Sequence, residues 1–261
     1  MTLYDAEFYT RFERGSASSA DVVVPLLLAA LPVRSVLDIG CGTGLWLQTF
    51  ARHGVTDLLG LDGEHVAPGM LRIDPARFRV ADLRRPPELG RRFDLACSFE
   101  VAEHLPPDCA HPFVRLLTRA APFVAFSAAV PNQGGVGHVN ERTQSYWAAL
   151  FADEGYVAID PIRPAVRGDG RVEWWYRQNL LVYCAPGHRP RRYPPLTEAL
   201  YLDLIDPGMV EAKLMEISAL QAPPHAVLPA LRAIVLDLSA LGRAAMSWAL
   251  RIVGAYGARS P

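Results

Sequence analysis

The sequence predicts an α/β protein: a doubly wound, Rossmann-like sheet of seven mostly parallel strands, with helices on both faces and a helical C-terminal tail. Three observations lead to this prediction. From residue 35 onward, short β-branched runs alternate with helical patterns, which is typical of a parallel sheet. The first run leads into a glycine-rich turn and an apolar helix. Of the 261 residues, 51% are hydrophobic and 20% charged, the balance of a globular chain with a sizeable core.

The elements of this sheet are expected in a simple order. A helix over residues 21–31 comes first and ends before a turn at Pro32. The helices between the strands carry apolar stripes at helical spacing, and Gly54 and Gly155 close two of them. The expected strands are 35–40, 57–62, 77–82, 93–100, 123–129, 156–160 and 179–185, and the expected helices are 45–53, 109–121 and 143–156.

The composition changes after Pro186, where a proline- and arginine-rich connection begins. We therefore predict three parts: an N-terminal helical lid or cap segment over residues 1–34, a core domain over 35–186 and a helical C-terminal extension over 187–261. Helices are expected at 197–219 and 229–255. The second has an apolar stripe that would pack against the core or a second copy of the chain, so a homodimer through the C-terminal helices is considered.

Charge and cysteine usage narrow the class of protein. The formal net charge is −1, so no overall basic field attracts nucleic acid or anionic lipid, and neither is predicted as a partner. The first residues do not form a signal peptide, and the apolar stretches are interrupted by proline or charge, so no membrane span is expected. Four cysteines without a CxxC pair suit buried thiols in a reducing cytosol. We predict a cytoplasmic protein.

The most informative segment is VLDIGCGTG, residues 36–44, a buried strand that enters a glycine turn. Glycines permit positive φ and let a ligand approach the backbone. The dinucleotide fingerprint would need glycine at position 45, where Leu45 stands, and no lysine follows Gly44 as a phosphate loop would require. Asp38 would repel a pyrophosphate but would tolerate a ligand with a cationic amine and a sulfonium. An NAD-dependent dehydrogenase is disfavoured for the same reasons.

VLDIGCGTG resembles the first motif of class I S-adenosylmethionine-dependent methyltransferases, and the resemblance covers about residues 35 to 184. It implies an enzyme that uses S-adenosyl-L-methionine and releases S-adenosyl-L-homocysteine. By this resemblance Asp62 would bind the ribose hydroxyls, and Asp82 the adenine amino group. An ordinary turn aspartate is the alternative for each. The residues expected to contact the cofactor are Tyr9, Asp38, Gly40, Cys41, Gly42, Gly44, Asp62, Gly63, Ala81, Asp82, Leu83, Phe99 and Glu100.

Two segments are expected at the acceptor side. FEVAEHL follows the fourth strand and contains Glu103 and His104, and PNQGGVGHVNER follows the fifth and contains His138. Histidine titrates near neutrality, so His138 or His104 could take the acceptor proton, with Glu103 as the third catalytic candidate. For His104, a buried histidine bonded to backbone is an equal alternative. The three glycines around His138 favour a mobile lid.

Glu100, Glu103, His104 and His138 together resemble the metal-ligand pattern of ubiquinone-type O-methyltransferases and small-RNA 2′-O-methyltransferases. The same sequence is common in relatives without metal, so we assign no metal and keep a divalent ion as the alternative.

RVEWWYRQN, residues 171–179, is the other unusual stretch. Its aromatic residues could hold a sugar or a planar ring, although packing in a hairpin is the favoured interpretation. The leading hypothesis is O-methylation of a small hydroxylated acceptor, a sugar or natural-product intermediate. N- or C-methylation of a small molecule and a non-catalytic S-adenosylmethionine-binding protein are the alternatives.

Overall fold

The computed structural model describes the backbone of residues 6–85 and 87–219, and the side chains of 14–85 and 87–217. Contacts divide the chain into two units, Met1–Thr197 and Glu198–Pro261. The first unit contains the whole sheet. The division into three parts predicted from composition stays a prediction.

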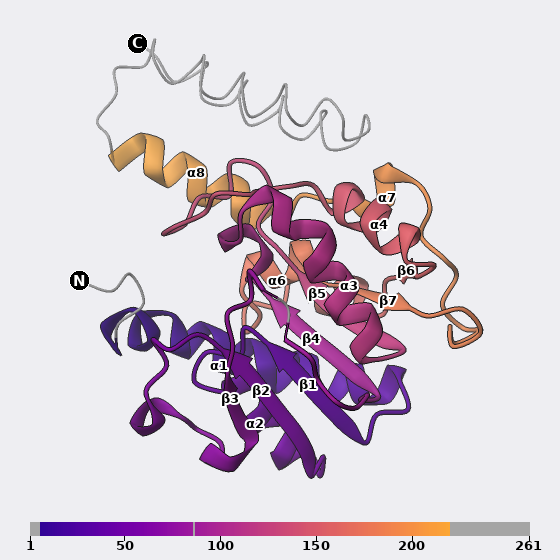
Figure 1. Cartoon of the computed structure of the whole chain (residues 1–261). Coiled ribbons are helices and arrows are strands. Elements are labelled where there is room, and N and C mark those ends of the chain that lie inside the picture. Colours follow the sequence, from indigo (N-terminus) through magenta and orange to yellow (C-terminus); the bar gives the residue numbers. More distant parts are fainter. Residues whose placement is uncertain (1–5, 86, 220–261) are drawn as a thin grey trace, which may run out of the picture. The chain divides into compact units, whose positions relative to one another are not determined.

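The first unit is built on one seven-stranded sheet with the order β3-β2-β1-β4-β5-β7-β6 (Figure 1). All neighbouring strands are parallel except β7, which is antiparallel to both β5 and β6. The predicted fold class is therefore confirmed. The strands are β1 (Ser35–Ile39), β2 (Asp57–Asp62), β3 (Phe78–Val80), β4 (Leu95–Phe99), β5 (Phe123–Ser127), β6 (Val157–Ile159) and β7 (Leu181–Cys184).

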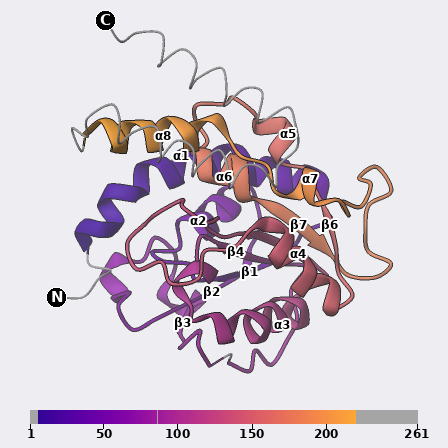
Figure 2. The same ribbon diagram turned by 90° about the horizontal axis from the view of Figure 1, so that it is seen from above.

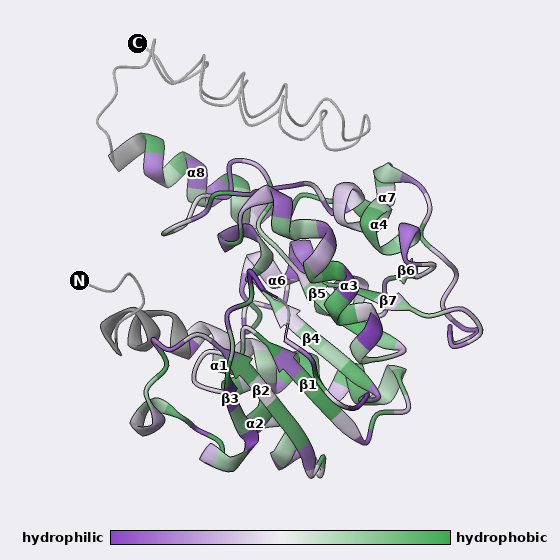
Figure 3. Cartoon of the chain, viewed as in Figure 1, coloured by the Kyte–Doolittle hydropathy of each residue, from purple (hydrophilic) through white to green (hydrophobic). Residues whose placement is uncertain are grey.

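Helices cover both faces of the sheet (Figure 2). On one face lie α1 (Ala6–Ala30), α2 (Leu45–Arg52), α5 (Arg163–Val166) and α6 (Trp174–Asn179), which share one apolar cluster with the strands. On the other face lie α3 (Ala110–Ala120) and α4 (Gln144–Asp153). Because both faces are covered, β4 and β5 are buried along their whole lengths. The strands accordingly show as apolar arrows in Figure 3.

Helix α1 begins well before the helix that the sequence predicted over residues 21–31. Gly15 and the serines that follow it have low intrinsic helix propensity, so the sequence pattern hides the first half of the helix. Tertiary contacts hold this part in place. Ser18 Oγ donates to the carbonyl of Arg171 at 2.5 Å, and the backbone N–H of Glu173 donates to Ser19 Oγ at 3.0 Å. These bonds tie α1 to the loop that leads into α6.

Two further predictions are wrong in detail. The aromatic stretch at residues 174–176 does not pack in a hairpin, because it forms α6. The helix expected over 197–219 is interrupted and becomes α7 (Ala199–Leu202) and α8 (Pro207–Ala219). Proline disfavours a helical residue before it, and the Asp206 carboxylate accepts from the Gly208 N–H at 2.8 Å, which starts a new helix.

The expected helix at 229–255, and with it the considered dimer contact, lies outside the described residues. Within the described part of the chain, no helix combines the length and hydropathy that a membrane crossing needs.

Candidate active site

A pocket of about 1040 Å³ opens at the carboxyl ends of β1, β2 and β4. The chain runs from β1 outward to β2 and β3 and then returns to β4 on the other side of β1. This reversal separates the loops after β1 and β4 and leaves a crevice between them, the usual ligand site of open α/β sheets. The pocket is lined by the turn after β1, the ends of β2 to β4, the loop at 133–138 and α6.

The glycine turn after β1 forms one end of this pocket. Gly40, Gly42 and Gly44 all have positive φ, of 81°, 53° and 79°. A Cβ on Gly40 would lie 2.3 Å from Val101 Cγ2, and one on Gly44 would lie 2.8 Å from Ile73 Cγ1. Gly40, Cys41 and Gly42 line the pocket, whereas Gly44 is not among its described lining residues. The need for glycine at position 44 therefore comes from its positive φ and from packing against Ile73.

Two aspartates lie beneath and beside the turn. Asp38 is buried, and its Oδ2 has no hydrogen-bond partner among the described residues. Burial, and then repulsion from Asp62, raise the pKa of Asp38 to about 8. Asp62 ends β2, and its carboxylate accepts from the N–H groups of Gly42 at 2.6 Å and Gly63 at 2.7 Å. Burial raises the pKa of Asp62, and these two bonds partly oppose the rise.

The segment after β3 lines the pocket with three expected residues. Ala81 and Leu83 are buried, whereas Asp82 between them is exposed. The Asp82 carboxylate is held by the Arg84 guanidinium at 2.8 and 3.0 Å, and this bond lowers the pKa of Asp82. Asp82 therefore faces the pocket already paired.

Glu100 follows β4 in a strained conformation, with a φ of 56°. Its carboxylate accepts from the Gln133 carboxamide at 2.7 Å and from Asn179 Nδ2 at 3.2 Å. Asn179 Nδ2 also donates to Gln133 Oε1 at 2.9 Å. Burial raises the pKa of Glu100 to about 7. Sequence reasoning missed the contacts of Gln133 and Asn179 with Glu100, because two loops and the end of α6 supply the three residues and no local pattern marks their meeting.

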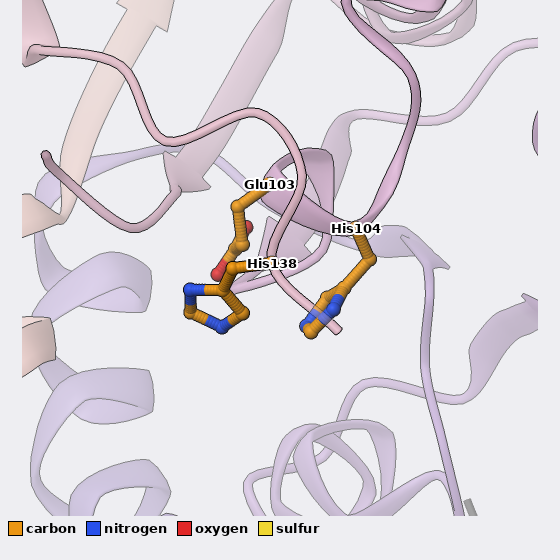
Figure 4. Close-up of side chains that lie close together, drawn as sticks. All are labelled: Glu103, His104 and His138. Carbon is orange, nitrogen blue, oxygen red and sulfur yellow. The ribbon is translucent and has the colours of Figure 1, made fainter. Parts of the chain in front are cut away.

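Glu103, His104 and His138 meet in the part of the pocket that is lined by the segment after β4 and the loop at 133–138 (Figure 4). Each offers a donor atom, and these atoms lie within 4.8 Å of one another. Glu103 is fully buried, and neither carboxylate oxygen has a hydrogen-bond partner in the part of the chain that the structure describes. Burial, and then repulsion from Glu100, hold the pKa of Glu103 well above its usual value. The three predicted catalytic residues are thus brought together.

Backbone bonds join the two segments that supply these residues. The Glu103 carbonyl accepts from the N–H groups of Val139 at 2.9 Å and Asn140 at 3.0 Å. His104 Nδ1 lies 3.4 Å from the Gly137 carbonyl, and the two histidine rings meet edge to face at 4.8 Å. Burial, and then repulsion from His138, lower the pKa of His104 to about 4. His104 is therefore neutral at physiological pH.

An aromatic wall, defined here as Trp46, Phe99, Trp174, Trp175 and Tyr176, lines the same pocket. The Trp46 and Phe99 ring centroids are 4.3 Å apart, and the Trp174 and Trp175 centroids are 5.5 Å apart. Trp174 and Trp175 remain partly exposed, whereas Tyr176 is buried and contacts Ser16 Oγ of α1 at 3.3 Å. The sequence analysis had singled out Phe99 and the stretch that contains Trp174, Trp175 and Tyr176, but it missed Trp46, which stands two residues after Gly44.

Tyr9 lies on α1, but its side chain is outside the described residues, and its contact with the cofactor stays a prediction.

Two kinds of comparison relate the chain to known proteins. A family model described as a methyltransferase domain matches residues 11–176, more than half of the chain. The ubiquinone biosynthesis O-methyltransferase of Acinetobacter baylyi is 26% identical over 137 residues, 49% of this chain and 53% of that protein. The protein of the same name from Methylobacterium nodulans is 37% identical over 90 residues, 31% of this chain and 33% of that protein. The chain spans about half or less of the length of these curated relatives.

Solved structures agree at the level of the fold. An amino pentose methyltransferase from Micromonospora echinaspora, solved with S-adenosylmethionine, superposes with a TM-score of 0.50 and 22% identity, covering 70% of this chain and 98% of that one. A putative O-methyltransferase from Nostoc punctiforme gives a TM-score of 0.51 at 14% identity, covering 68% and 59%. Because the family match runs from α1 through the glycine turn to α6, the chain belongs to the class I S-adenosylmethionine-dependent methyltransferases.

Proposed function

We propose that this protein transfers the methyl group of S-adenosylmethionine to a hydroxyl group of a small, ring-bearing acceptor. The observation that carries the proposal is the placement of Glu103, His104 and His138 in the same pocket as the glycine turn. Methyl transfer to an alcohol needs a group that takes the hydroxyl proton, because an alcohol is a poor nucleophile while it keeps that proton.

The cofactor would lie along the carboxyl ends of β1 to β3. Asp38 Oδ2 is buried beneath the turn without a hydrogen-bond partner among the described residues, which suits the α-ammonium group of the methionine part. Asp62 accepts one backbone N–H on each carboxylate oxygen, and His65 Nε2 lies 3.3 Å from Oδ1; the lone pairs that remain suit the ribose hydroxyls. Ala81 and Leu83 would flank the adenine ring, and Asp82, shared with Arg84, would accept from its amino group.

The acceptor would lie beyond β4, between the histidines and the aromatic wall. The sulfonium is already a good leaving group, so the protein mainly aligns the acceptor oxygen and excludes water. His138 would take the hydroxyl proton, with His104 and the buried Glu103 beside it. The partly exposed rings of Trp174 and Trp175 would bind a flat ring, since aromatic faces stack on such groups.

The same cluster carries a second candidate, a divalent ion held by Glu103, His104 and His138. The residues fit such an ion because Glu103 places two buried oxygens beside two imidazoles, and neither oxygen has a hydrogen-bond partner among the residues described. A bound ion would supply a positive charge that lowers the pKa of the acceptor hydroxyl. The chain's own part would then be to hold the donors in place and shield the hydroxyl from water.

The experiment is a screen of acceptors with labelled S-adenosylmethionine. Phenols, sugars and aliphatic alcohols are tested, each beside an amine of similar size. Each assay runs with magnesium and with a chelator. We expect O-methylated products from ring-bearing alcohols. Loss of activity with the chelator would favour a divalent ion, and unchanged activity would favour a histidine that acts without metal. Products formed only from amines, or at carbon, would replace O-methylation by the alternatives, and no product with bound cofactor would favour a non-catalytic binding protein.

A further inference from the structure

We infer that Glu141 is a positioning residue, which holds His138 with its proton on Nδ1 so that Nε2 is the atom available to the acceptor or an ion. His138 Nδ1 lies 2.9 Å from Glu141 Oε1, and both side chains are largely buried, with exposed fractions of 13% and 20%. An ionised carboxylate only accepts hydrogen bonds, so the ring nitrogen that faces it must carry hydrogen. In a neutral imidazole the other nitrogen then has the free lone pair.

Glu141 also shapes the loop that carries His138. Its Oε2 accepts from the Asn132 N–H at 2.8 Å, and its Oε1 accepts from the Gly134 N–H at 2.9 Å. Asn132 and Gly134 both have positive φ, of 67° and 75°. One carboxylate therefore joins a strained turn and the histidine, so that the turn and the ring orientation depend on the same group.

Glycine at position 135 keeps a side chain away from the edge of the ring that carries Nε2. A Cβ on Gly135 would lie 2.2 Å from His138 Nε2 and 2.4 Å from Cε1. A larger residue at position 135 would therefore collide with the ring in the orientation that Glu141 holds. This arrangement is that of a carboxylate that fixes the tautomer of a functional histidine.

The tautomer of His138 is a property of the free protein and can be tested without an acceptor. The role of Nε2 in binding the acceptor or an ion rests on the proposed function. The test is a long-range proton–nitrogen NMR spectrum of the histidine rings in ¹⁵N-labelled protein, at a pH about two units above the ordinary histidine pKa. Comparison with His138→Gln identifies the His138 signals. The wild type is expected to show the Nδ1–H tautomer.

Glu141→Ala should move His138 to the Nε2–H tautomer, which free histidine prefers in water, while Glu141→Gln should largely keep Nδ1–H through its carboxamide oxygen. Glu154→Ala is the matched control, since Glu154 lies 3.3 Å from His111 Nε2 but outside the described pocket lining, and it should leave His138 unchanged. A rise of the melting temperature with S-adenosylhomocysteine confirms that each variant is folded.

An Nε2–H tautomer in the wild type would overturn the inference, as would an unchanged tautomer in folded Glu141→Ala. If Glu141→Ala does not fold, the tautomer of the wild type decides the inference, because a histidine without a carboxylate partner would prefer Nε2–H. With an acceptor in hand, kcat should fall about 100-fold in Glu141→Ala and recover in Glu141→Gln, with cofactor affinity unchanged. If the NMR spectrum shows the Nδ1–H tautomer but the screen yields no O-methylated product, this inference stands and the proposed function is wrong.

Discussion

The two ends of the pocket are built in different ways. At the cofactor end, one neighbouring strand end holds the turn after β1: the N–H groups of Gly40 and Cys41 donate to the Leu61 carbonyl of β2, and the Gly42 N–H donates to the Asp62 carboxylate. At the acceptor end, side chains from distant segments meet, as Glu100, Gln133 and Asn179 do. The first end depends on a short stretch of sequence, and the second depends on how loops come together.

This difference gives the two ends of the pocket different expected roles. We expect the turn to bind the cofactor, which is the same in every reaction of the family. We expect the side-chain arrangement to select the acceptor, because it changes with each substitution. Mutations should therefore divide into those that affect cofactor binding and those that affect turnover.

The largest effect is expected from His138→Ala at the acceptor end. Loss of a group that takes the acceptor proton should lower kcat by about 10²–10⁴-fold. The dissociation constant for S-adenosylhomocysteine, measured by calorimetry, should stay within about twofold, because His138 belongs to the other end. His188→Ala, an exposed histidine outside the described lining, serves as the control. Unchanged turnover in His138→Ala would remove the histidine from the mechanism.

Gly42→Val tests the cofactor end. The φ of 53° is unfavourable for a β-branched residue, and the side chain would enter the pocket where the backbone should contact the cofactor. We expect S-adenosylhomocysteine to bind about 100-fold more weakly and to lose most of its effect on the melting temperature. Gly54→Val has the same backbone problem, with a φ of 88°, in open space away from the pocket. If both variants bind equally well, the turn does not hold the cofactor.

Asp38→Asn tests the cofactor end through the pH dependence of protein stability. The folded-state pKa of about 8 lies above the ordinary value of 3.8, so between these pH values the folded protein holds a proton that the unfolded chain has lost. Wild-type stability should therefore fall as the pH rises from about 4 to 8. The asparagine variant, which resembles the protonated acid, should match the stability of the wild type near pH 4 and exceed it increasingly as the pH rises toward 8.

Denaturant unfolding at several pH values measures this difference in the free energy of unfolding. Saturating S-adenosylhomocysteine should reduce the advantage of Asp38→Asn, because the ligand's ammonium group would stabilise the wild-type carboxylate. A parallel pH dependence in both proteins would mean that Asp38 does not titrate in the folded protein in the way its burial implies.

The sheet could be predicted closely from local pattern. The run at 57–62 became β2 with the same ends, and the other expected strands differ from the observed ones by a few residues at their ends. These segments are apolar, β-branched and bounded by turns, so local preference and tertiary environment favour the same structure. Predictions were wrong where the two disagree. The serine-rich start of α1 and the aromatic residues of α6 take their helical form from contacts with each other.

The amino-acid sequence by itself determined the doubly wound fold and the glycine turn, because strand pattern, turn chemistry and helix signals act over short distances along the chain. Only the tertiary structure decided that β7 enters between β5 and β6 and that Gln133 and Asn179 hold Glu100. The contact of Glu141 with His138 is local, since the two residues stand three positions apart in one loop, and the backbone conformation of that loop brings them together. Strand order and the amide contacts join segments far apart in sequence, so they depend on the packing of the whole sheet, which no short stretch of residues encodes.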